Sequence, residues 1–150
     1  MKSAFIFTLL LLSLSCSKSS VDKTSDAFEF GTFYSMCIGN ECHTTYSIRG
    51  NKLYRTTVNV SSKNKVTVKL SDSKYQTALV LKTGFPDAML AKPNTTYGCP
   101  DCADGGGTFV RIIKNSDTLY WNYDNTIQND RDPAFAYFRS IWPVMAELKK

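Results

Sequence analysis

From residue 28 to residue 60, apolar and aromatic side chains recur at every second position and alternate with polar or small ones. A period of two places one set of side chains on each face of a strand, so this stretch is constrained to be extended rather than helical. Gly-Asn pairs at 39–40 and 50–51 interrupt the alternation, with glycine in the position that a type II′ turn requires. The pattern therefore predicts a meander of three antiparallel strands joined by tight turns.

The pattern changes from strand to helix after this meander. A shorter alternation at 66–70 indicates a fourth strand, and Ser71 then supplies a helix cap. Residues at helical spacing follow until Gly84 and Pro86, which are typical of a helix end. We expect the next segment, up to residue 97, to be a loop with one helical turn at 86–90.

The last part of the chain predicts a hairpin followed by a helix. Strands are indicated at 108–114 and 118–123, with turn-forming residues between them. Asp132 offers a carboxylate cap just before Pro133, which suits the first helical position. One apolar stripe follows at helical spacing, and Pro143 within it is expected to bend or split the helix. The stripe comprises Ala134, Phe138, Ile141, Met145 and Leu148.

These elements predict an α+β fold, with an antiparallel sheet of about five or six strands and two helices packed on one face. The sheet consists of the meander and the later hairpin. About 120 residues from Phe28 onward are enough for one compact domain with a single core and too few for two ordinary domains. We therefore expect one domain over residues 28–150, preceded by a segment with a different role.

The N-terminal segment has the layout of a signal peptide, with a charged start and an apolar run over 4–14. This run is about half the roughly 20 residues that a membrane-spanning helix needs. Ser15 followed by Cys16 resembles the lipobox of bacterial lipoproteins, in which the cysteine carries the lipid and becomes the mature N-terminus. The resemblance implies a signal peptide at 1–15 and lipidation at Cys16. The polar composition of residues 17–27 predicts that the lipidated cysteine is followed by a flexible tether, so that 16–27 form the anchor segment. Ordinary secretion, with a free or structural Cys16, is the alternative.

The four remaining cysteines are candidates for structural disulfides, because the cell envelope is an oxidising compartment. They are Cys37, Cys42, Cys99 and Cys102. Cys37 and Cys42 flank the predicted turn at 39–40, where facing side chains of a hairpin lie within reach of a cross-strand bridge. Four cysteines allow three pairings, and the sequence does not choose among them, although 37–42 and 99–102 are favoured. Two alternatives stay open: a zinc-stabilised structural module, and a thiol-disulfide oxidoreductase that uses the Cys-Pro-Asp-Cys motif.

The residue pattern gives little support for catalysis by other known enzyme motifs. The chain lacks a G-x-S-x-G elbow, a phosphate-binding loop and an HExxH helix. The only histidine, His43, follows Cys42 in a predicted strand, where neighbours point to opposite faces, so a catalytic pair is disfavoured. We expect no catalytic residues, no metal site and no cofactor. Basic residues are dispersed along the chain despite its net charge of +5, so a nucleic-acid partner is not expected.

Candidate ligand-binding residues come from the abundant aromatic side chains. Tyr34, Tyr46 and Tyr54 fall on the predicted strands and could form one flat aromatic face, although cross-strand pairing and cover of the core explain them more simply.

The motif Cys-x-Gly-x-x-Cys followed by Tyr-x-Ile, with a Ser-capped helix and a late hairpin, is similar to small uncharacterised lipoprotein domains of bacterial envelopes. This resemblance implies one sheet packed on two helices and transfers no catalytic residues. We therefore expect a non-enzymatic lipoprotein of the cell envelope, facing the periplasm or the surface. It would contact the membrane through its lipid and bind an unknown protein or small molecule.

Overall fold

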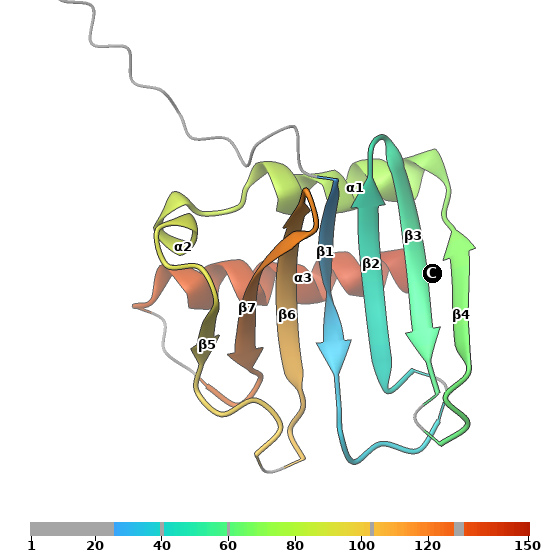
Figure 1. Cartoon of the computed structure of the whole chain (residues 1–150), viewed down its shortest axis with the longest axis horizontal. Helices are drawn as coiled ribbons and strands as arrows, with labels where there is room; N and C mark the ends of the chain where they lie inside the picture. The colour runs from blue at the N-terminus through green and yellow to red at the C-terminus, as the bar shows by residue number, and fades with distance from the viewer. Residues whose placement is uncertain (1–25, 40, 60, 103, 128–130) are drawn as a thin grey trace, which may run out of the picture.

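The computed structural model describes residues 26–39, 41–59, 61–102, 104–127 and 131–150, and these form one sheet with helices on one side (Figure 1). The strands are β1 (Ala27–Phe33), β2 (His43–Arg49), β3 (Lys52–Val58), β4 (Lys65–Lys69), β5 (Thr95–Tyr97), β6 (Gly107–Lys114) and β7 (Asp117–Asp124). The helices are α1 (Asp72–Thr83), α2 (Asp87–Leu90) and α3 (Pro133–Lys149). The α+β class is confirmed, and the short α2 lies where one helical turn is expected.

The strands are ordered β4-β3-β2-β1-β6-β7-β5, so β1 lies in the middle of the seven-stranded sheet. All neighbouring strands are antiparallel except β5, which runs parallel to β7. The expectation of a purely antiparallel sheet with five or six strands is therefore wrong in detail. β5 has only three residues and pairs with β7, which lies more than 20 residues away in the sequence. Neither a local alternation of side chains nor a tight turn therefore predicts it.

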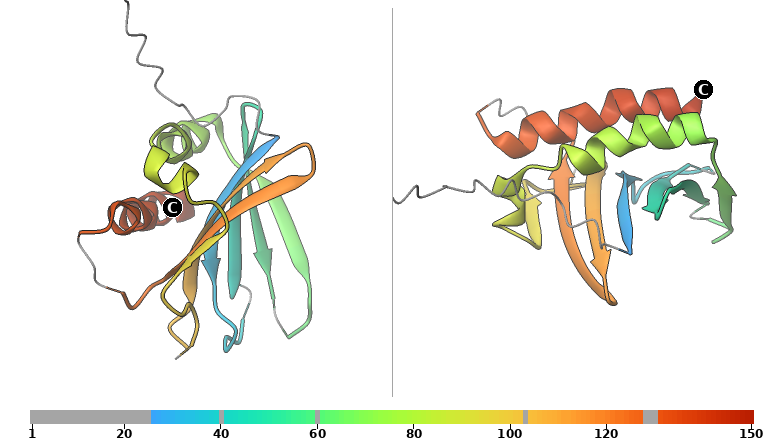
Figure 2. Two further views of the ribbon diagram at one scale, coloured as in Figure 1. Left: turned by 60° about the vertical axis from the view of Figure 1, so that its left-hand side comes forward. Right: turned by 90° about the horizontal axis from the view of Figure 1, so that it is seen from above.

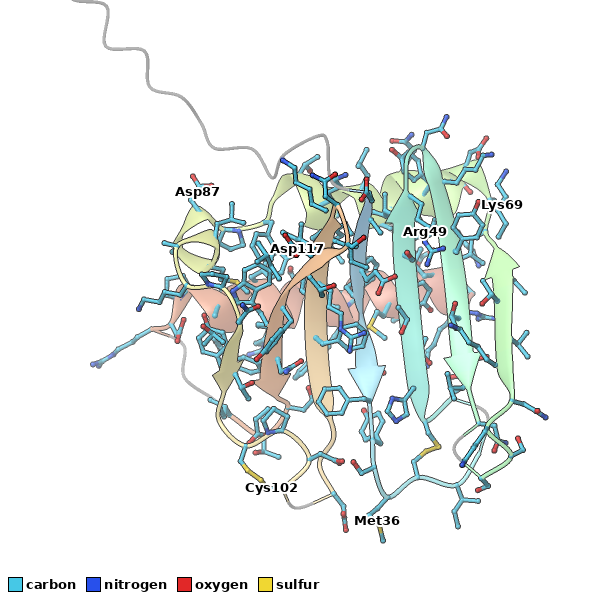
Figure 3. The ribbon with its side chains drawn as sticks, viewed as in Figure 1. Met36, Arg49, Lys69, Asp87, Cys102 and Asp117 are labelled. Atoms are coloured by element: carbon cyan, nitrogen blue, oxygen red, sulfur yellow. A yellow bond between two sulfur atoms is a disulfide. The ribbon has the colours of Figure 1, made fainter. Side chains whose placement is uncertain are left out.

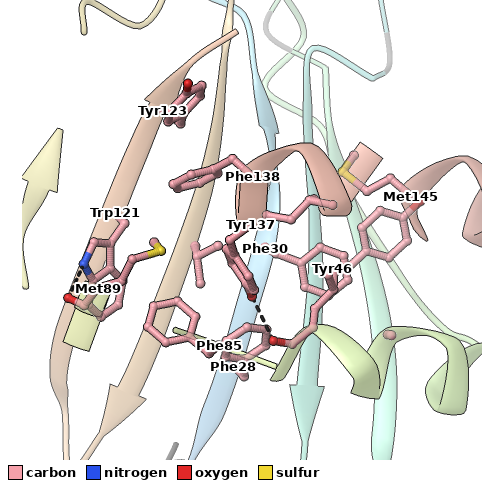
Figure 4. Packing of buried hydrophobic residues seen from close by; sticks show 14 of the residues in the cluster. Phe28, Phe30, Tyr46, Phe85, Met89, Trp121, Tyr123, Tyr137, Phe138 and Met145 are labelled. Carbon is pink, nitrogen blue, oxygen red and sulfur yellow. Dashed lines mark hydrogen bonds between the residues drawn. The ribbon is translucent and has the colours of Figure 1, made fainter. Parts of the chain in front are cut away.

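The hydrophobic core lies between the sheet and the two long helices, α1 and α3, which cover the same face (Figure 2). Phe28 and Phe30 of β1 are fully buried there together with Trp121 of β7 and Phe138 of α3 (Figure 4). Each buried aromatic side chain removes a large apolar area from water, at roughly 25 cal/mol per Å². We call the opposite side of the sheet the open face, because no helix of the described residues covers it.

The predicted helix caps are confirmed. The Ser71 hydroxyl accepts a hydrogen bond from the backbone N–H of Lys74 at 3.4 Å, and the Asp132 carboxylate accepts one from Ala134 at 2.8 Å. Pro143 does not split α3, which continues through it to Lys149. The expectation that Pro143 splits the helix is therefore wrong, and the alternative, a bend, stays a prediction. Buried apolar side chains on both sides of the proline hold the helix against the sheet and offset the hydrogen bond that proline removes.

The tight turns of the sheet agree with the sequence at two places and differ at a third. Residues 50–51 join β2 to β3 as a two-residue turn, because Arg49 faces Lys52. Asn115 and Ser116 form the turn between β6 and β7, and both have positive φ, as a type I′ turn requires. The β1–β2 pairing ends at Phe33 and His43, so the connection between these strands is longer than the two-residue turn predicted at 39–40.

Candidate functional site

Both disulfides lie at the same end of the sheet, where β1 ends and β2 and β6 begin; Figure 3 marks this end with Met36 and Cys102. Cys37 is bonded to Cys42 across 5.4 Å between Cα atoms, and Cys99 to Cys102 across 5.5 Å. The favoured pairing of the four cysteines is therefore confirmed. We call this region the disulfide end and define it as residues 34–39, 41–42, 98–102 and 104–106 with the adjoining part of α3.

The Cys37–Cys42 disulfide closes a loop and does not bridge two paired strands. The last backbone contact is the hydrogen bond from the N–H of Tyr34 to the carbonyl of Cys42, at 3.0 Å. Beyond it the chain turns outward, so that Met36 is 77% exposed and Ile38 97% exposed. The alternation of apolar residues therefore continues past the end of the strand, and its last two members face solvent instead of the core.

Two grooves meet at this loop. A groove of about 490 Å³ lies over the loop itself, and one of about 280 Å³ lies between the loop and α3. Tyr34 and Glu41 line both grooves, and Trp142 lines the second. The indole N–H of Trp142 donates to the Thr108 hydroxyl at 3.1 Å, which fixes a side chain that is still 39% exposed. The disulfide end thus offers ordered apolar side chains beside a polar rim.

Asp101 connects the two disulfide loops. Its carboxylate accepts hydrogen bonds from the backbone N–H of Ser35 at 2.7 Å and of Gly106 at 3.2 Å. Hydrogen bonding from Ser35, and then from Gly106, lowers the pKa of Asp101 below the usual aspartate value. Gly106 has a φ of +67°, and a Cβ at this position would clash with the ring of Tyr34, so the two loops pack closely. The carboxylate therefore holds the exposed apolar loop in place.

The surroundings of the Cys-Pro-Asp-Cys motif differ from those of a reactive thiol. An acidic thiol usually lies at a helix N-terminus or beside a cation. In the described residues around Cys99 and Cys102 no helix begins, and the carboxylate of Asp124 accepts the backbone N–H of Cys99 at 3.2 Å. Negative charge near a cysteine disfavours its thiolate. Metal binding finds no support either, since the described residues contain no cluster of three or more potential ligands.

The three candidate tyrosines do not share a surface. Tyr34 lies at the disulfide end, whereas Tyr46 is fully buried in the core and stacks on Phe30 at 5.4 Å between ring centres. Tyr54 lies on the open face, 5.9 Å from the guanidinium carbon of Arg49. The turn at 50–51 already determines this outcome, because it sets Tyr46 opposite Arg55 and so sends Tyr46 and Tyr54 to opposite faces. Of the three, only Tyr34 belongs to the candidate site.

Sequence reasoning missed the exposure of Met36 and Ile38 and the contribution of Trp142. The signal for the first two was present, because a disulfide across a short segment also suits a closed loop, in which alternation no longer implies burial. No comparable signal marks Trp142, whose place depends on how α3 lies across the sheet.

The lipobox and the candidate lipidation site, Cys16, lie outside the described residues. None of the helices in the described part of the chain combines the length and apolarity needed to cross a bilayer. No protein-family model matches the chain. No curated protein and no solved structure matches it either.

Proposed function

We propose that this chain is a lipid-anchored protein of a bacterial envelope that binds another envelope protein through its disulfide end. The observation that carries the proposal is the exposure of Ile38 and Met36 on a loop closed by the Cys37–Cys42 disulfide. Large apolar side chains that are exposed on a loop closed by a covalent cross-link are typical of interaction sites.

The position of the loop in the domain favours a partner located away from the anchor. The described chain begins at Asp26, whose N–H donates to the carbonyl of Ile113 and whose carboxylate accepts the N–H of Asn115, both at 2.8 Å. These contacts tie the N-terminal side of the domain to the β6–β7 turn, at the opposite end of the sheet from Met36 (Figures 1 and 3). A tether from Cys16 would therefore join the domain at the end opposite the disulfide end, which leaves the disulfide end free to reach a partner away from the bilayer.

The chemistry of the loop favours a protein partner with apolar side chains. Met36 is flexible and polarisable, so it adapts to varied apolar surfaces, and Ile38 offers a branched aliphatic anchor. The disulfide and Asp101 order the loop before binding, which lowers the entropic cost of association. The two adjoining grooves are open to solvent and together extend over a wide surface, as a protein partner requires.

Photo-crosslinking in the native envelope tests this proposal. A photoreactive residue at position 38 should capture a defined protein, whereas the same residue at Val80 should not. Val80 is a matched control because it is an apolar residue of α1 that is 56% exposed and far from the loop. Ile38→Asp should abolish capture by a photoreactive residue at position 36. Equal capture at positions 38 and 80 would refute the assignment of the disulfide end.

The anchor is tested separately by mass spectrometry of the mature protein extracted from membranes. We expect acyl chains on Cys16 and no residues before it. A mature protein that retains residues 1–15, or that carries an unmodified Cys16, would contradict lipid anchoring without affecting the binding site.

Thiol-disulfide exchange is the alternative function, and one observation favours it: both Cys99 and Cys102 are exposed. If this were the activity, replacing both residues with serine would abolish reduction of an envelope disulfide substrate. The proposed binding function predicts instead that this double variant still binds its partner through Ile38.

A further inference from the structure

The basic residues that are dispersed along the sequence come together on one half of the sheet. Residues 42–71 contain no aspartate or glutamate, and they form β2, β3, β4 and the connections between these strands. The segment carries six basic residues, namely Arg49, Lys52, Arg55, Lys63, Lys65 and Lys69. Arg49 contacts a carboxylate of the neighbouring strand, Glu29, at 3.5 Å. This half of the sheet is therefore strongly positive, and β4 is its outermost strand.

β4 is an edge strand with an open side. In the described part of the sheet no strand lies beyond it, and all five of its residues are exposed. Val66 and Val68 point to the helix side and are 57% and 38% exposed. The side chains of Lys65, Thr67 and Lys69 point to the open face. An edge of this kind presents unpaired backbone groups next to apolar side chains, which is the geometry that accepts an added strand.

The register shows which backbone groups face outward. The N–H of Leu70 donates to the carbonyl of Leu53 at 2.9 Å, so these two residues form a hydrogen-bonded pair. Such pairs alternate with non-hydrogen-bonded pairs along an antiparallel ladder. Val66 and Val68 therefore bond inward to β3. The non-hydrogen-bonded pair Thr56–Thr67 agrees with this register, because the two hydroxyl oxygens are 2.9 Å apart.

It follows that the backbone N–H and C=O groups of Lys65, Thr67 and Lys69 point away from the sheet. These groups are spaced along the open side of β4 at every second residue, as the hydrogen bonds to another strand require.

A second copy of the same strand fits this edge poorly. The sequence of β4, Lys-Val-Thr-Val-Lys, is symmetric about Thr67. If two copies of β4 paired antiparallel about this residue, Lys65 of each copy would lie opposite Lys69 of the other. Like charges directly opposite each other destabilise a strand pair, and lysines on an edge commonly prevent such self-pairing.

We propose that the open edge of β4 binds an acidic extended segment of another protein as an eighth strand. Backbone hydrogen bonds to Lys65, Thr67 and Lys69 supply the strand pairing. Acidic residues opposite Lys65 and Lys69 supply charge complementarity, and apolar residues between them cover Val66 and Val68. The segment recognised thus has the pattern acidic, apolar, any residue, apolar, acidic. This site is separate from the disulfide end.

The test uses the full chain and a synthetic peptide of sequence Gly-Glu-Val-Thr-Val-Glu-Gly with blocked ends. Binding is measured by fluorescence polarisation, and amide hydrogen exchange reports protection of Lys65, Thr67 and Lys69. A control peptide with proline in place of threonine keeps the charge and cannot complete the ladder. We expect about tenfold weaker binding of the control peptide. Equal binding of the two peptides would overturn the proposal.

Two variants of the chain separate strand addition from charge attraction. Thr67→Pro removes an outward N–H and leaves the inward bonds of β4 intact, so the fold should persist while peptide binding falls about tenfold. Lys65→Glu combined with Lys69→Glu should reverse the preference toward a peptide with lysines in place of glutamates. The affinity of Thr67→Pro for the acidic peptide and for anionic phosphatidylglycerol vesicles is compared with that of the unchanged chain. If the variant bound both with unchanged affinity, the surface would attract polyanions by charge alone, and strand addition would be refuted.

Ile38→Asp serves as the cross-control. It alters the disulfide end and should leave peptide binding unchanged, so failure at β4 and failure at the disulfide end can be told apart. Loss of peptide binding in Ile38→Asp would contradict the location of the site at β4.

Discussion

The hydroxyl of Tyr137 provides a direct test of how the two long helices are held together. Tyr137 of α3 is 6% exposed, and its hydroxyl donates to the carbonyl of Leu81 at 2.9 Å (Figure 4). Leu81 lies in the last turn of α1, where carbonyl groups have no partner within the helix. Tyr137→Phe keeps the ring and removes only this hydrogen bond, leaving a buried acceptor unsatisfied. We expect the free energy of unfolding to fall by about 1.5 kcal/mol.

Urea unfolding followed by circular dichroism measures this change, and thermal unfolding should show a fall of about 5 °C in Tm for a domain of this size. Tyr120→Phe is the matched control, because Tyr120 lies on the open face of β7 and is 38% exposed. The control should change stability by less than about 0.5 kcal/mol. If the two variants lost the same stability, the bond to Leu81 would contribute nothing and the reasoning would be refuted.

Three further predictions concern pH and local structure. Burial raises the pKa of Tyr137. Its contribution to the free energy of unfolding is therefore complete below the tyrosine pKa of an unfolded chain, about 10, and falls at higher pH. Urea unfolding at a series of pH values above about 10 should show that the free energy of unfolding declines less steeply with pH in Tyr137→Phe than in the unchanged chain. Pro143→Ala should raise the free energy of unfolding by about 2 kcal/mol in the same urea assay, because it restores a helix hydrogen bond at an exposed position. An unchanged urea concentration at the unfolding midpoint would contradict this prediction. Asp101→Ala should lower the amide-exchange protection factors of Ser35 and Gly106, which compare each rate with that of an unfolded chain at the same pH. Acidification below pH 3.8 should lower them in the unchanged chain too, because a carboxyl with a lowered pKa loses its stabilising effect as pH falls through that pKa. Unchanged protection factors in both cases would show that Asp101 does not hold the loops.

Local sequence was informative wherever a few neighbouring residues decide the structure. Ser71 and Asp132 cap helices because the groups they satisfy lie two or three residues away. The turn at 50–51 sets the whole β2–β3 register, including the separation of Tyr46 from Tyr54.

The two-residue turn predicted at 39–40 differs because the β1–β2 pairing already ends at Phe33 and His43. The Cys37–Cys42 disulfide closes the segment between these strands without strand pairing, and Asp101, far along the chain, accepts the backbone N–H of Ser35 just after β1. β5 is a similar case, since its pairing with β7 and not its own composition makes it a strand.

The amino-acid sequence by itself determined the α+β class, the meander, the helix caps and the favoured disulfide pairs, because these depend on side-chain periodicity and on contacts a few residues apart. Only the tertiary structure decided that β1 occupies the centre of the sheet, that the groove beside Met36 and Ile38 adjoins the groove beside Trp142, and that the scattered lysines gather beside an open edge. Those features depend on which strands pair and how α3 crosses them. Such choices are made by packing between distant segments, for which a linear pattern carries no local signal.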